Sequence, residues 1–352
     1  MKAWRFDTFG NYEKLKLEEI REMVVGEHEV KIRVGVAGVN PVDRSTLSGR
    51  FDWIRRPFVT GAEFTGTVVD AGGKVNGISK GERVAVFPRL FCGRCHYCLR
   101  GDETACLINT HMDRAPFIIG VEREGGWEEF VNVPDTNVIP LPDHISMLDA
   151  ATVPVDGGTA MRMVGRAHPS PGEFMLVMGS TGGIGSFAVQ LGRMYGCEVA
   201  AVVSRDEHGN KLSELGADHI INREREEVVK RVKELTNSRG ADIVIDPLGS
   251  ATFQSSTLAL APLGRYATCG ILTGAKAEVD LARLYSMQIE YIGSTNMRRV
   301  DVINMLSFIA SGKIKPLIDS VFNFNDLPKA MQRLDTKGRF GKVMMRVDAS
   351  AK

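Results

Sequence analysis

The segment FMLVMGSTGGIGSFAVQLGRMYG, residues 174–196, decides the fold of this chain. A continuous apolar run, residues 174–178, leads into a glycine-rich turn and then into a helix-like run from residue 187. Strand, glycine turn and helix in this order begin a phosphate-binding βαβ unit, in which N–H groups of the helix N-terminus face the phosphate. Gly182 lets the backbone approach a pyrophosphate, and Gly185 permits close packing of the helix on the strand. The usual first glycine is displaced by one residue, to Gly179, and a glycine turn without a ligand is the alternative.

The chain after residue 196 repeats the alternation of strand and helix. Residues 199–203, 242–246 and 265–269 are predicted as buried strands, and helical segments end near Leu215 and Leu235. Strands that alternate with helices of about ten to fifteen residues predict a parallel sheet of the α/β class. In that context the glycine turn is predicted to bind a dinucleotide through six consecutive residues: Ser180, Thr181, Gly182, Gly183, Ile184 and Gly185.

The second strand of this sheet, residues 199–203, is followed by Ser204 and Arg205. An acidic residue at this place would bind the ribose 2′-hydroxyl of NAD. A hydroxyl and a guanidinium suit a 2′-phosphate instead, because arginine offers a planar fork of donors to phosphate oxygens. We therefore expect NADP(H) as cofactor, with two alternatives: Arg205 is only solvated, or Asp206 binds the ribose.

The first 150 residues or so follow a different pattern. Residues 30–40, 63–73 and 81–87 are rich in valine and alternate roughly with period two, which predicts strands. Turn residues separate them at short intervals, which is typical of a small β-barrel rather than of a layered parallel sheet. Near the end of the chain, residues 302–309 are predicted as a helix and residues 342–347 as a last strand.

Length and composition exclude several classes of protein. The chain has 352 residues, which suggests two domains. Its formal net charge of +1 gives no reason to expect nucleic acid or an anionic membrane as partner. No stretch approaches the ~18 apolar residues of a membrane helix, and the first ten residues, MKAWRFDTFG, lack the apolar core of a signal peptide. We expect a soluble, cytoplasmic protein.

Four of the six cysteines lie within fifteen residues, at Cys92, Cys95, Cys98 and Cys106. Their spacing lets one compact loop, the cysteine lobe (residues 92–106), place four thiolates around a tetrahedral ion. Zinc is expected, as one structural ion per subunit, because four sulfur ligands leave no open coordination position. A disulfide and an iron–sulfur cluster are the alternatives, although the bacterial ferredoxin spacing differs from this one.

Several motifs together make the chain resemble the medium-chain dehydrogenase/reductase superfamily over nearly its whole length. They are the cysteine lobe, the glycine turn, GAEFTGTVVDAG (61–72), GGWEEFVNVP (125–134), LGADHIIN (215–222) and GRFGKV (338–343). The resemblance implies an α/β plus β fold: a chaperonin-10-like β-barrel catalytic domain, residues 1–155 and 296–352, interrupted by a Rossmann domain, residues 156–295, that binds NADP. It also implies an active site in the cleft between the domains, a structural zinc on the lobe, and a homodimer or homotetramer.

The chain departs from the family at the catalytic zinc. Where alcohol dehydrogenases carry a cysteine, this chain has Asn40, in a sequence typical of the quinone oxidoreductase branch. The Gly-His-Glu triplet of the family is changed to glycine, Ala62 and Glu63, and Asp156 stands at the third ligand position. An amide and two carboxylates provide poorly for zinc, so no catalytic zinc is expected. Glu63 or Asp156 could donate a proton in its place, or both are hydrogen-bonded remnants.

Other positions are assigned by the same resemblance. Asp43 is a further catalytic candidate, whereas the hydroxyl residue that relays protons in many members is replaced by Val42. Cys269 and Gly270 match the segment beside the nicotinamide, and Arg339 matches a basic residue that often contacts the cofactor. Three further residues lie near loops that form the cleft, but packing or a surface position is expected for each rather than substrate contact: Trp53, Phe91 and His111.

The predicted chemistry is hydride transfer to or from a small-molecule carbonyl or alcohol. Reduction of a ketone develops an alkoxide that needs a Lewis acid or a proton donor, whereas a quinone or enone develops a weaker base. The missing zinc favours a quinone or enone, and the intact lobe favours the alcohol dehydrogenases. We expect interconversion of ketone and alcohol, with quinone or enone reduction as the alternative and a non-catalytic NADPH-binding protein as the second.

Overall fold

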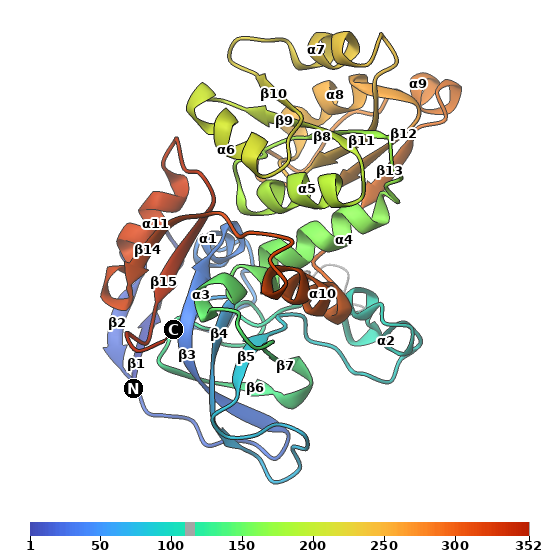
Figure 1. The fold of residues 1–352 in the computed structure, drawn as a ribbon. Coiled ribbons are helices and arrows are strands. Elements are labelled where there is room, and N and C mark those ends of the chain that lie inside the picture. The colour runs from blue at the N-terminus through green and yellow to red at the C-terminus, as the bar shows by residue number, and fades with distance from the viewer. Residues whose placement is uncertain (110–116, 352) are drawn as a thin grey trace. The chain divides into compact units, whose positions relative to one another are not determined.

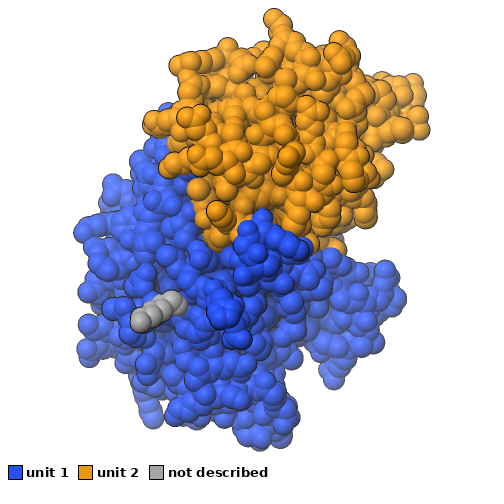
Figure 2. Space-filling view, viewed as in Figure 1, with its two compact units in different colours: residues 1–155, 297–313, 318–352 blue, residues 156–296, 314–317 orange. Residues whose placement is uncertain are grey.

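The computed structural model describes residues 1–109 and 117–351, so that His111 lies outside the described residues. The chain forms two compact units, each built around its own sheet (Figure 2). The first unit comprises residues 1–155, 297–313 and 318–352, and the second comprises residues 156–296 and 314–317.

The second unit contains a six-stranded sheet in which all neighbouring strands are parallel (Figure 1). Its strands are β8 (Phe174–Val177), β9 (Glu198–Val203), β10 (His219–Asn222), β11 (Ala241–Asp246), β12 (Leu260–Thr268) and β13 (Glu290–Gly293). They lie in the order β10-β9-β8-β11-β12-β13. This is the doubly wound order, in which ligands bind at the carboxyl ends of the strands where the order reverses, beside the first strand of the sheet.

Helices connect these strands: α4 (Gly158–Arg166), α5 (Gly183–Met194), α6 (Gly209–Glu214), α7 (Val228–Leu235), α8 (Ser250–Leu258) and α9 (Leu281–Ser286). All four residues of β8 are buried, which explains why its sequence is continuously apolar. The helix expected from residue 187 begins four residues earlier, because α5 already includes Gly183 and Gly185 of the turn. The core of this unit includes Phe174, Val244 and Tyr266.

The first unit contains a seven-stranded sheet and a separate two-stranded ribbon. Its strands are β1 (Lys2–Arg5), β2 (Lys16–Glu19), β3 (Glu29–Val39), β4 (Phe64–Ala71), β5 (Arg83–Val86), β6 (Phe130–Pro134), β7 (Val138–Pro140), β14 (Ile318–Asn323) and β15 (Lys342–Arg346). The order β14-β15-β3-β4-β5-β7, with β6 also on β3, is antiparallel except between β14 and β15. The last strand of the chain therefore lies beside β3, so that residues far apart in sequence meet there.

Short helices complete this unit: α1 (Pro41–Leu47), α2 (His96–Leu99), α3 (Met147–Ala150), α10 (Arg299–Ala310) and α11 (Leu327–Asp335). Single turns of 3₁₀ helix lie at Tyr12–Lys14, Glu103–Ala105, Leu107–Asn109, Asp135–Asn137 and Phe324–Asp326, with one more in the second unit at Asp206–His208 and a π turn at Val153–Gly157. The core is built on Phe6, Phe64 and Trp127, all fully buried. In the described part of the chain, no helix combines the length and the apolar character that crossing a bilayer requires.

Candidate functional site

The glycine turn between β8 and α5 has the backbone that a phosphate loop needs. Gly179 has φ +60°, which a side chain would make unfavourable. A Cβ on Gly185 would lie 2.3 Å from the Gly179 carbonyl oxygen, so only glycine allows α5 to pack this closely. Gly182, at the N-cap of α5, meets only that carbonyl, at 3.4 Å, and leaves its other side open. The first N–H groups of α5 are therefore presented at a turn without bulky side chains, as pyrophosphate binding requires.

Ser180 within this turn is fully buried, and its Oγ donates to the Val202 carbonyl oxygen at 2.6 Å. The bond fixes the turn against β9. The hydroxyl of Ser180 is thus used in a hydrogen bond within the protein, while Thr181 and Ile184 are partly exposed. Backbone groups, rather than the serine side chain, are what this turn offers to a ligand.

The carboxyl end of β9 carries the residues expected to select the cofactor. Arg205 is 47% exposed and pairs with Glu207 at 3.2 Å. Asp206 accepts a hydrogen bond from Asn222 Nδ2 at 2.5 Å and pairs with Arg225 at 2.6 Å. Asp206, the acidic residue that could bind a ribose, is therefore already paired with Asn222 and Arg225. The guanidinium of Arg205 pairs instead with the exposed side chain of Glu207.

Cys269 and Gly270 follow the carboxyl end of β12. Burial raises the pKa of the Cys269 thiol to about 12, with Asp156 and Asp246 adding repulsion. A Cβ on Gly270 would lie 1.7 Å from the Pro247 carbonyl oxygen, so this position must be glycine. Arg339 lies in the first unit, where its Nη1 donates to the Gly341 carbonyl oxygen at 2.6 Å.

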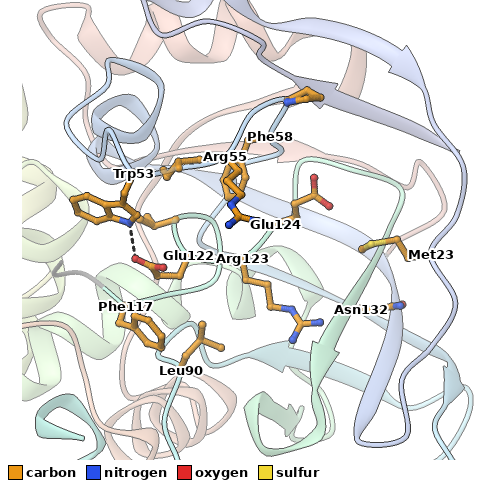
Figure 3. Close-up of a pocket in the computed structure, with 13 residues that line it drawn as sticks. Met23, Trp53, Arg55, Phe58, Leu90, Phe117, Glu122, Arg123, Glu124 and Asn132 are labelled. Carbon is orange, nitrogen blue, oxygen red and sulfur yellow. Dashed lines mark hydrogen bonds between the residues drawn. The ribbon is translucent and has the colours of Figure 1, made fainter. Parts of the chain in front are cut away.

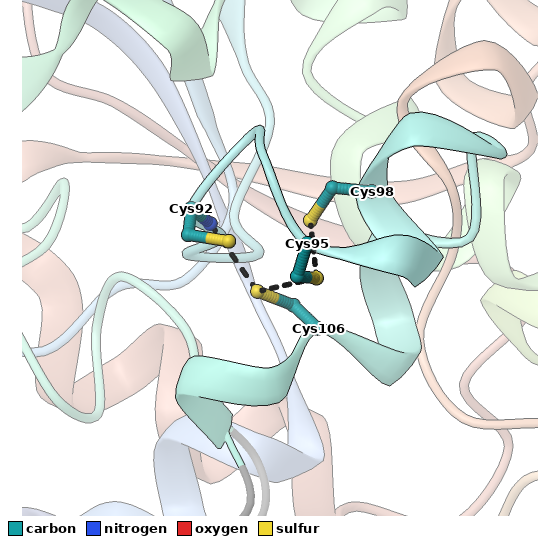
Figure 4. Close-up of side chains that lie close together, drawn as sticks. All are labelled: Cys92, Cys95, Cys98 and Cys106. Atoms are coloured by element: carbon teal, nitrogen blue, oxygen red, sulfur yellow. Dashed lines mark hydrogen bonds between the residues drawn. The ribbon is translucent and has the colours of Figure 1, made fainter.

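The cysteine lobe brings its four sulfur atoms together (Figure 4). The four Sγ atoms all lie within 4.8 Å of one another, with Cys95 at 3.5 Å from Cys98 and 3.9 Å from Cys106. Zinc–sulfur bonds of about 2.3 Å in a tetrahedron require sulfur–sulfur distances of about 3.8 Å. Backbone hydrogen bonds from Leu107 and Cys98 lower the pKa of Cys95 to about 6, whereas burial raises the pKa of Cys98 to about 12 and that of Cys106 as well. The sulfurs are too far apart for a disulfide bond of about 2.05 Å.

A second cluster is fully buried at the end of β3 and the start of β15. Lys342 Nζ donates to Asn40 Oδ1 at 2.5 Å and pairs with Glu63 Oε2 at 2.6 Å. Asn40 Nδ2 donates to the same Glu63 oxygen at 3.0 Å, and the Val155 N–H donates to Glu63 Oε1 at 2.7 Å. We call Asn40, Glu63 and Lys342 the buried cluster.

Asp43, in the first turn of α1, accepts hydrogen bonds from the backbone beside the buried cluster. One carboxylate oxygen accepts the Asn40 N–H at 2.9 Å, and the other accepts the Ala62 N–H at 2.9 Å and the Thr60 hydroxyl at 3.3 Å. Burial raises the pKa of Asp43 to about 6 against these hydrogen bonds. Asp43 therefore fixes the backbone on both sides of the cluster, and its side chain has no exposed surface.

Lys342 belongs to this cluster although no sequence motif predicts it as a site residue. A lysine at the start of the apolar strand 342–347 needs a partner of opposite charge if that strand is buried, and this position is the one feature of the sequence that could have indicated its role. The pairing with Lys342 favours the carboxylate form of Glu63, which argues against Glu63 as a proton donor. Asp156 is nearly buried in the second unit.

A cavity of about 700 Å³ lies in the first unit (Figure 3). Apolar and aromatic side chains form much of its wall: Trp53, Ile54, Phe58, Leu90, Phe117 and Val121. Trp53 Nε1 donates to Glu122 Oε1 at 2.6 Å, which fixes the indole at the wall. Phe91, expected near the same loops, packs edge to face on Phe87 instead.

The cavity and the buried cluster share backbone segments. Phe58 and Val121 line the cavity, and each stands within two residues of a group that supports the cluster. These groups are Thr60, which bonds to Asp43, and Gly120, whose carbonyl oxygen accepts the Thr60 hydroxyl at 2.8 Å. A ligand in the cavity would thus bind beside the segments that position the cluster.

Comparison with known proteins identifies the family. Residues 26–143 match the model of the alcohol dehydrogenase GroES-like domain, and residues 183–311 match that of the zinc-binding dehydrogenases. An NAD-dependent alcohol dehydrogenase of Sulfolobus acidocaldarius is 33% identical, over 99% of this chain and 100% of the relative. This chain belongs to the medium-chain dehydrogenase/reductase superfamily. It is an alcohol dehydrogenase-like oxidoreductase, and the expected combination of a chaperonin-10-like domain with a Rossmann domain is confirmed.

Two further members are informative. The cobalt- and zinc-bound thermostable alcohol dehydrogenase of Pyrobaculum aerophilum has a TM-score of 0.90 and 37% identity, covering 99% of both chains. An acryloyl-coenzyme A reductase of Metallosphaera sedula is 27% identical over 96% of this chain and 97% of the relative. Members of this superfamily similar to our chain are thus named for two kinds of chemistry, on alcohols and on an unsaturated thioester.

The two zinc positions that the family resemblance implies have different side chains around them in this chain. The lobe fits zinc, because four cysteines at tetrahedral spacing form a complete ligand set. The catalytic position does not fit zinc: Asn40 offers an amide, Ala62 offers no ligand, and the Lys342 ammonium lies within 2.6 Å of both Asn40 and Glu63 oxygens. No step of the reaction is therefore assigned to a metal.

Proposed function

We propose that this protein is an NADP(H)-dependent alcohol dehydrogenase or ketone reductase that works without a catalytic zinc. The observation that carries the proposal is the Lys342 ammonium bonded to Asn40 and Glu63, where a metal-dependent member would need free ligands. Residues 156–295 would bind the cofactor, and residues 1–155 with 296–352 would bind the substrate and hold one structural zinc. A bound nicotinamide would supply hydride chemistry at the carbonyl carbon, and the carbonyl oxygen would take up a proton to give the alcohol.

The preference for NADP(H) rests on Arg205. Its exposed guanidinium stands at the end of β9, and Asp206 is engaged by Asn222 and Arg225. A charge-assisted hydrogen bond to a 2′-phosphate contributes roughly 1.5–3 kcal/mol, or about a ten- to hundredfold change in affinity. Because several relatives are named as NAD-dependent, a preference for NADP(H) would distinguish this chain from them.

Paired titrations of both cofactors test this preference. Arg205→Ala should weaken NADPH binding by about ten- to hundredfold and leave NADH binding nearly unchanged. Arg231→Ala is the matched control, because Arg231 is an exposed arginine of α7 that pairs with Glu234. Equal losses for NADH and NADPH, or a wild type that prefers NADH, would assign the ribose to Asp206 instead.

The cavity in the first unit suggests the kind of substrate. Its wall combines aromatic and aliphatic side chains with the charged Arg55, Arg123 and Glu124, which suits a carbonyl compound with an apolar body and polar substituents. Reduction of an enone or quinone is the second candidate, and the buried cluster is the observation that favours it. Because that cluster supplies no Lewis acid, an acceptor that develops a stabilised enolate or phenolate needs less support than a simple ketone.

A substrate panel with NADPH separates these candidates. Cyclic ketones, aldehydes, enones and quinones are offered to the purified protein, and products are identified as alcohols or saturated carbonyl compounds. Alcohol formation from isolated ketones supports the proposal. Turnover of enones or quinones alone would replace it by the second candidate, and NADPH binding without turnover of any carbonyl would make the protein a non-catalytic NADPH-binding member.

A further inference from the structure

Arg89 is a buried arginine of the first unit, and only 4% of the residue is exposed. Its Nη2 donates to the Thr104 carbonyl oxygen at 2.9 Å. Its Nε and Nη1 are buried without a hydrogen-bond partner among the residues that the structure describes. A charge in the interior is costly unless a group of opposite charge lies close to it. The position of Arg89 therefore needs an explanation that its one hydrogen bond does not give.

The backbone and the side chain of Arg89 are both held beside the cysteine lobe. Asn137 Nδ2 donates to the carbonyl oxygens of Phe87 and Arg89, at 2.7 and 2.8 Å. Thr104, the acceptor of Nη2, belongs to the 3₁₀ turn that directly precedes Cys106. Burial lowers the pKa of Arg89, and attraction to Cys106 raises it. The charged neighbour of this guanidinium is therefore a cysteine of the lobe.

We propose that Arg89 is the counter-cation of the cysteine lobe and increases its affinity for zinc. Four thiolates and one Zn²⁺ carry an excess of negative charge, because each thiolate contributes one unit and the ion removes two. A buried guanidinium attracts this excess more strongly than a solvated one, since little water screens it. Arg89 binds no metal itself and acts through the thiolates, as a positioning residue. The inference rests on the lobe zinc of the proposed function and names a side chain that supports it.

The other arginines of the lobe provide a comparison. Arg94 and Arg100 lie on the lobe itself, but both are exposed. Water and salt screen exposed charges, so that their loss changes a binding free energy little. Arg94→Gln is therefore the matched control for Arg89→Gln: the charge change is the same, and only the burial of the arginine differs.

Zinc affinity tests the inference. The full-length protein competes for zinc with a chromophoric chelator of known affinity. Arg89→Gln removes the charge but keeps an N–H that can donate to Thr104, and its zinc affinity should fall by about ten- to hundredfold, as when partners of metal ligands are removed. Arg89→Lys keeps a cation and should recover most of this loss. Arg94→Gln should stay within about fivefold of the wild type.

Cobalt in place of zinc gives a readout that a merely structural role of Arg89 would not move. The thiolate-to-cobalt charge-transfer absorption reports the energy of the sulfur electrons, which a nearby cation lowers. Arg89→Gln should shift this absorption to longer wavelength, and Arg89→Lys should restore it. An unshifted absorption in Arg89→Gln would overturn the inference, and so would a zinc affinity within about fivefold of the wild type or an equal loss of affinity in Arg89→Lys.

A variant that folds only with metal is still informative. Refolding of Arg89→Gln and Arg89→Lys is then followed against zinc concentration. A midpoint at least about tenfold higher for Arg89→Gln supports the inference, whereas equal midpoints, or no folding of either variant, contradict it. A wild type that binds no zinc would end the zinc part of the proposed function together with the inference. Zinc in the wild type with unchanged affinity in Arg89→Gln would end the inference alone.

Discussion

The cysteine lobe and the buried cluster differ in what neutralises their charge. The lobe gathers four sulfurs within 4.8 Å, a ligand set that a bound zinc ion would complete. The buried cluster contains its own cation, because the Lys342 ammonium lies 2.6 Å from Glu63. The lobe thus offers a set of metal ligands, whereas the carboxylate of the buried cluster is already paired within the protein.

This difference concerns how a buried charge is compensated. A buried carboxylate without a partner costs several kcal/mol. At the buried cluster a lysine from another strand supplies the compensating charge, and Asn40 accepts a second hydrogen bond from that lysine. The lobe instead keeps a cysteine at each of its four positions.

The largest effect is expected at the lobe. Cys92→Ser removes one of four ligands, and structural zinc contributes on the order of 10 kcal/mol of binding free energy in small zinc peptides. The variant should lose its zinc and unfold the lobe, which elemental analysis and thermal unfolding will show. Cys197→Ser is the matched control, because Cys197 is buried in the second unit and is not one of the four lobe cysteines, so that the zinc content should stay unchanged. A Cys92→Ser protein that keeps its zinc would show that the zinc is not bound by the lobe.

The next effect is expected at the buried cluster. Lys342→Met leaves Glu63 buried without its partner, which should lower the free energy of unfolding by about 3–5 kcal/mol. Lys329→Met removes an exposed pair with Asp326 and should cost less than about 1 kcal/mol. Denaturant unfolding of both variants measures the difference. Similar small losses would mean that the Lys342 pair contributes no more than a surface contact.

The smallest effect is a pH dependence from Asp43. Burial raises its pKa from 3.8 to about 6. Folding then takes up a proton, so the stabilisation is fully present below pH 3.8 and is lost as the pH rises through about 6. Asp43→Asn lacks this titration. The stability of the wild type relative to the variant should therefore fall by on the order of 2–3 kcal/mol between pH 4 and pH 7.

Asp319→Asn supplies a control of opposite sign. Asp319 is partly buried, which by itself raises a carboxyl pKa, but hydrogen bonds from Arg333 and Phe340 lower the pKa of Asp319 below 3.8. Its stabilisation is present above that pH and is lost as the pH falls further. Unfolding curves for Asp43→Asn and Asp319→Asn, measured from below pH 3.8 up to pH 7, show whether the stability difference from the wild type rises or falls with pH. A constant difference between wild type and Asp43→Asn would show that Asp43 titrates normally.

The two regions also differ in how far sequence could predict them. The lobe and the glycine turn are local: their residues are neighbours in the chain, so spacing alone predicts the site. The buried cluster combines Asn40, directly after β3, with Glu63, directly before β4, and Lys342, the first residue of β15. Lys342 lies 302 positions from Asn40. No local pattern predicts such a contact, and the absence of a catalytic zinc, suggested by Asn40 and Ala62, stays a prediction.

Cofactor selection lies between these cases. The sequence placed Ser204, Arg205 and Asp206 after β9 but left open which of them meets the ribose. The structure adds that Asp206 bonds to Asn222 and Arg225, which belong to the next strand and the turn after it. A choice between adjacent residues depends on such neighbours, and a single strand cannot provide them.

Metal stoichiometry tests the central claim most directly. Protein purified without chelator or added metal is analysed for zinc and other divalent metals per subunit, beside the Cys92→Ser variant. The account predicts one zinc per wild-type subunit and none in the variant, because the lobe offers four sulfur ligands, whereas Asn40 and Ala62 offer neither thiolate nor imidazole at the other position. Two tightly bound divalent ions per wild-type subunit, or one ion that remains in Cys92→Ser, would contradict it.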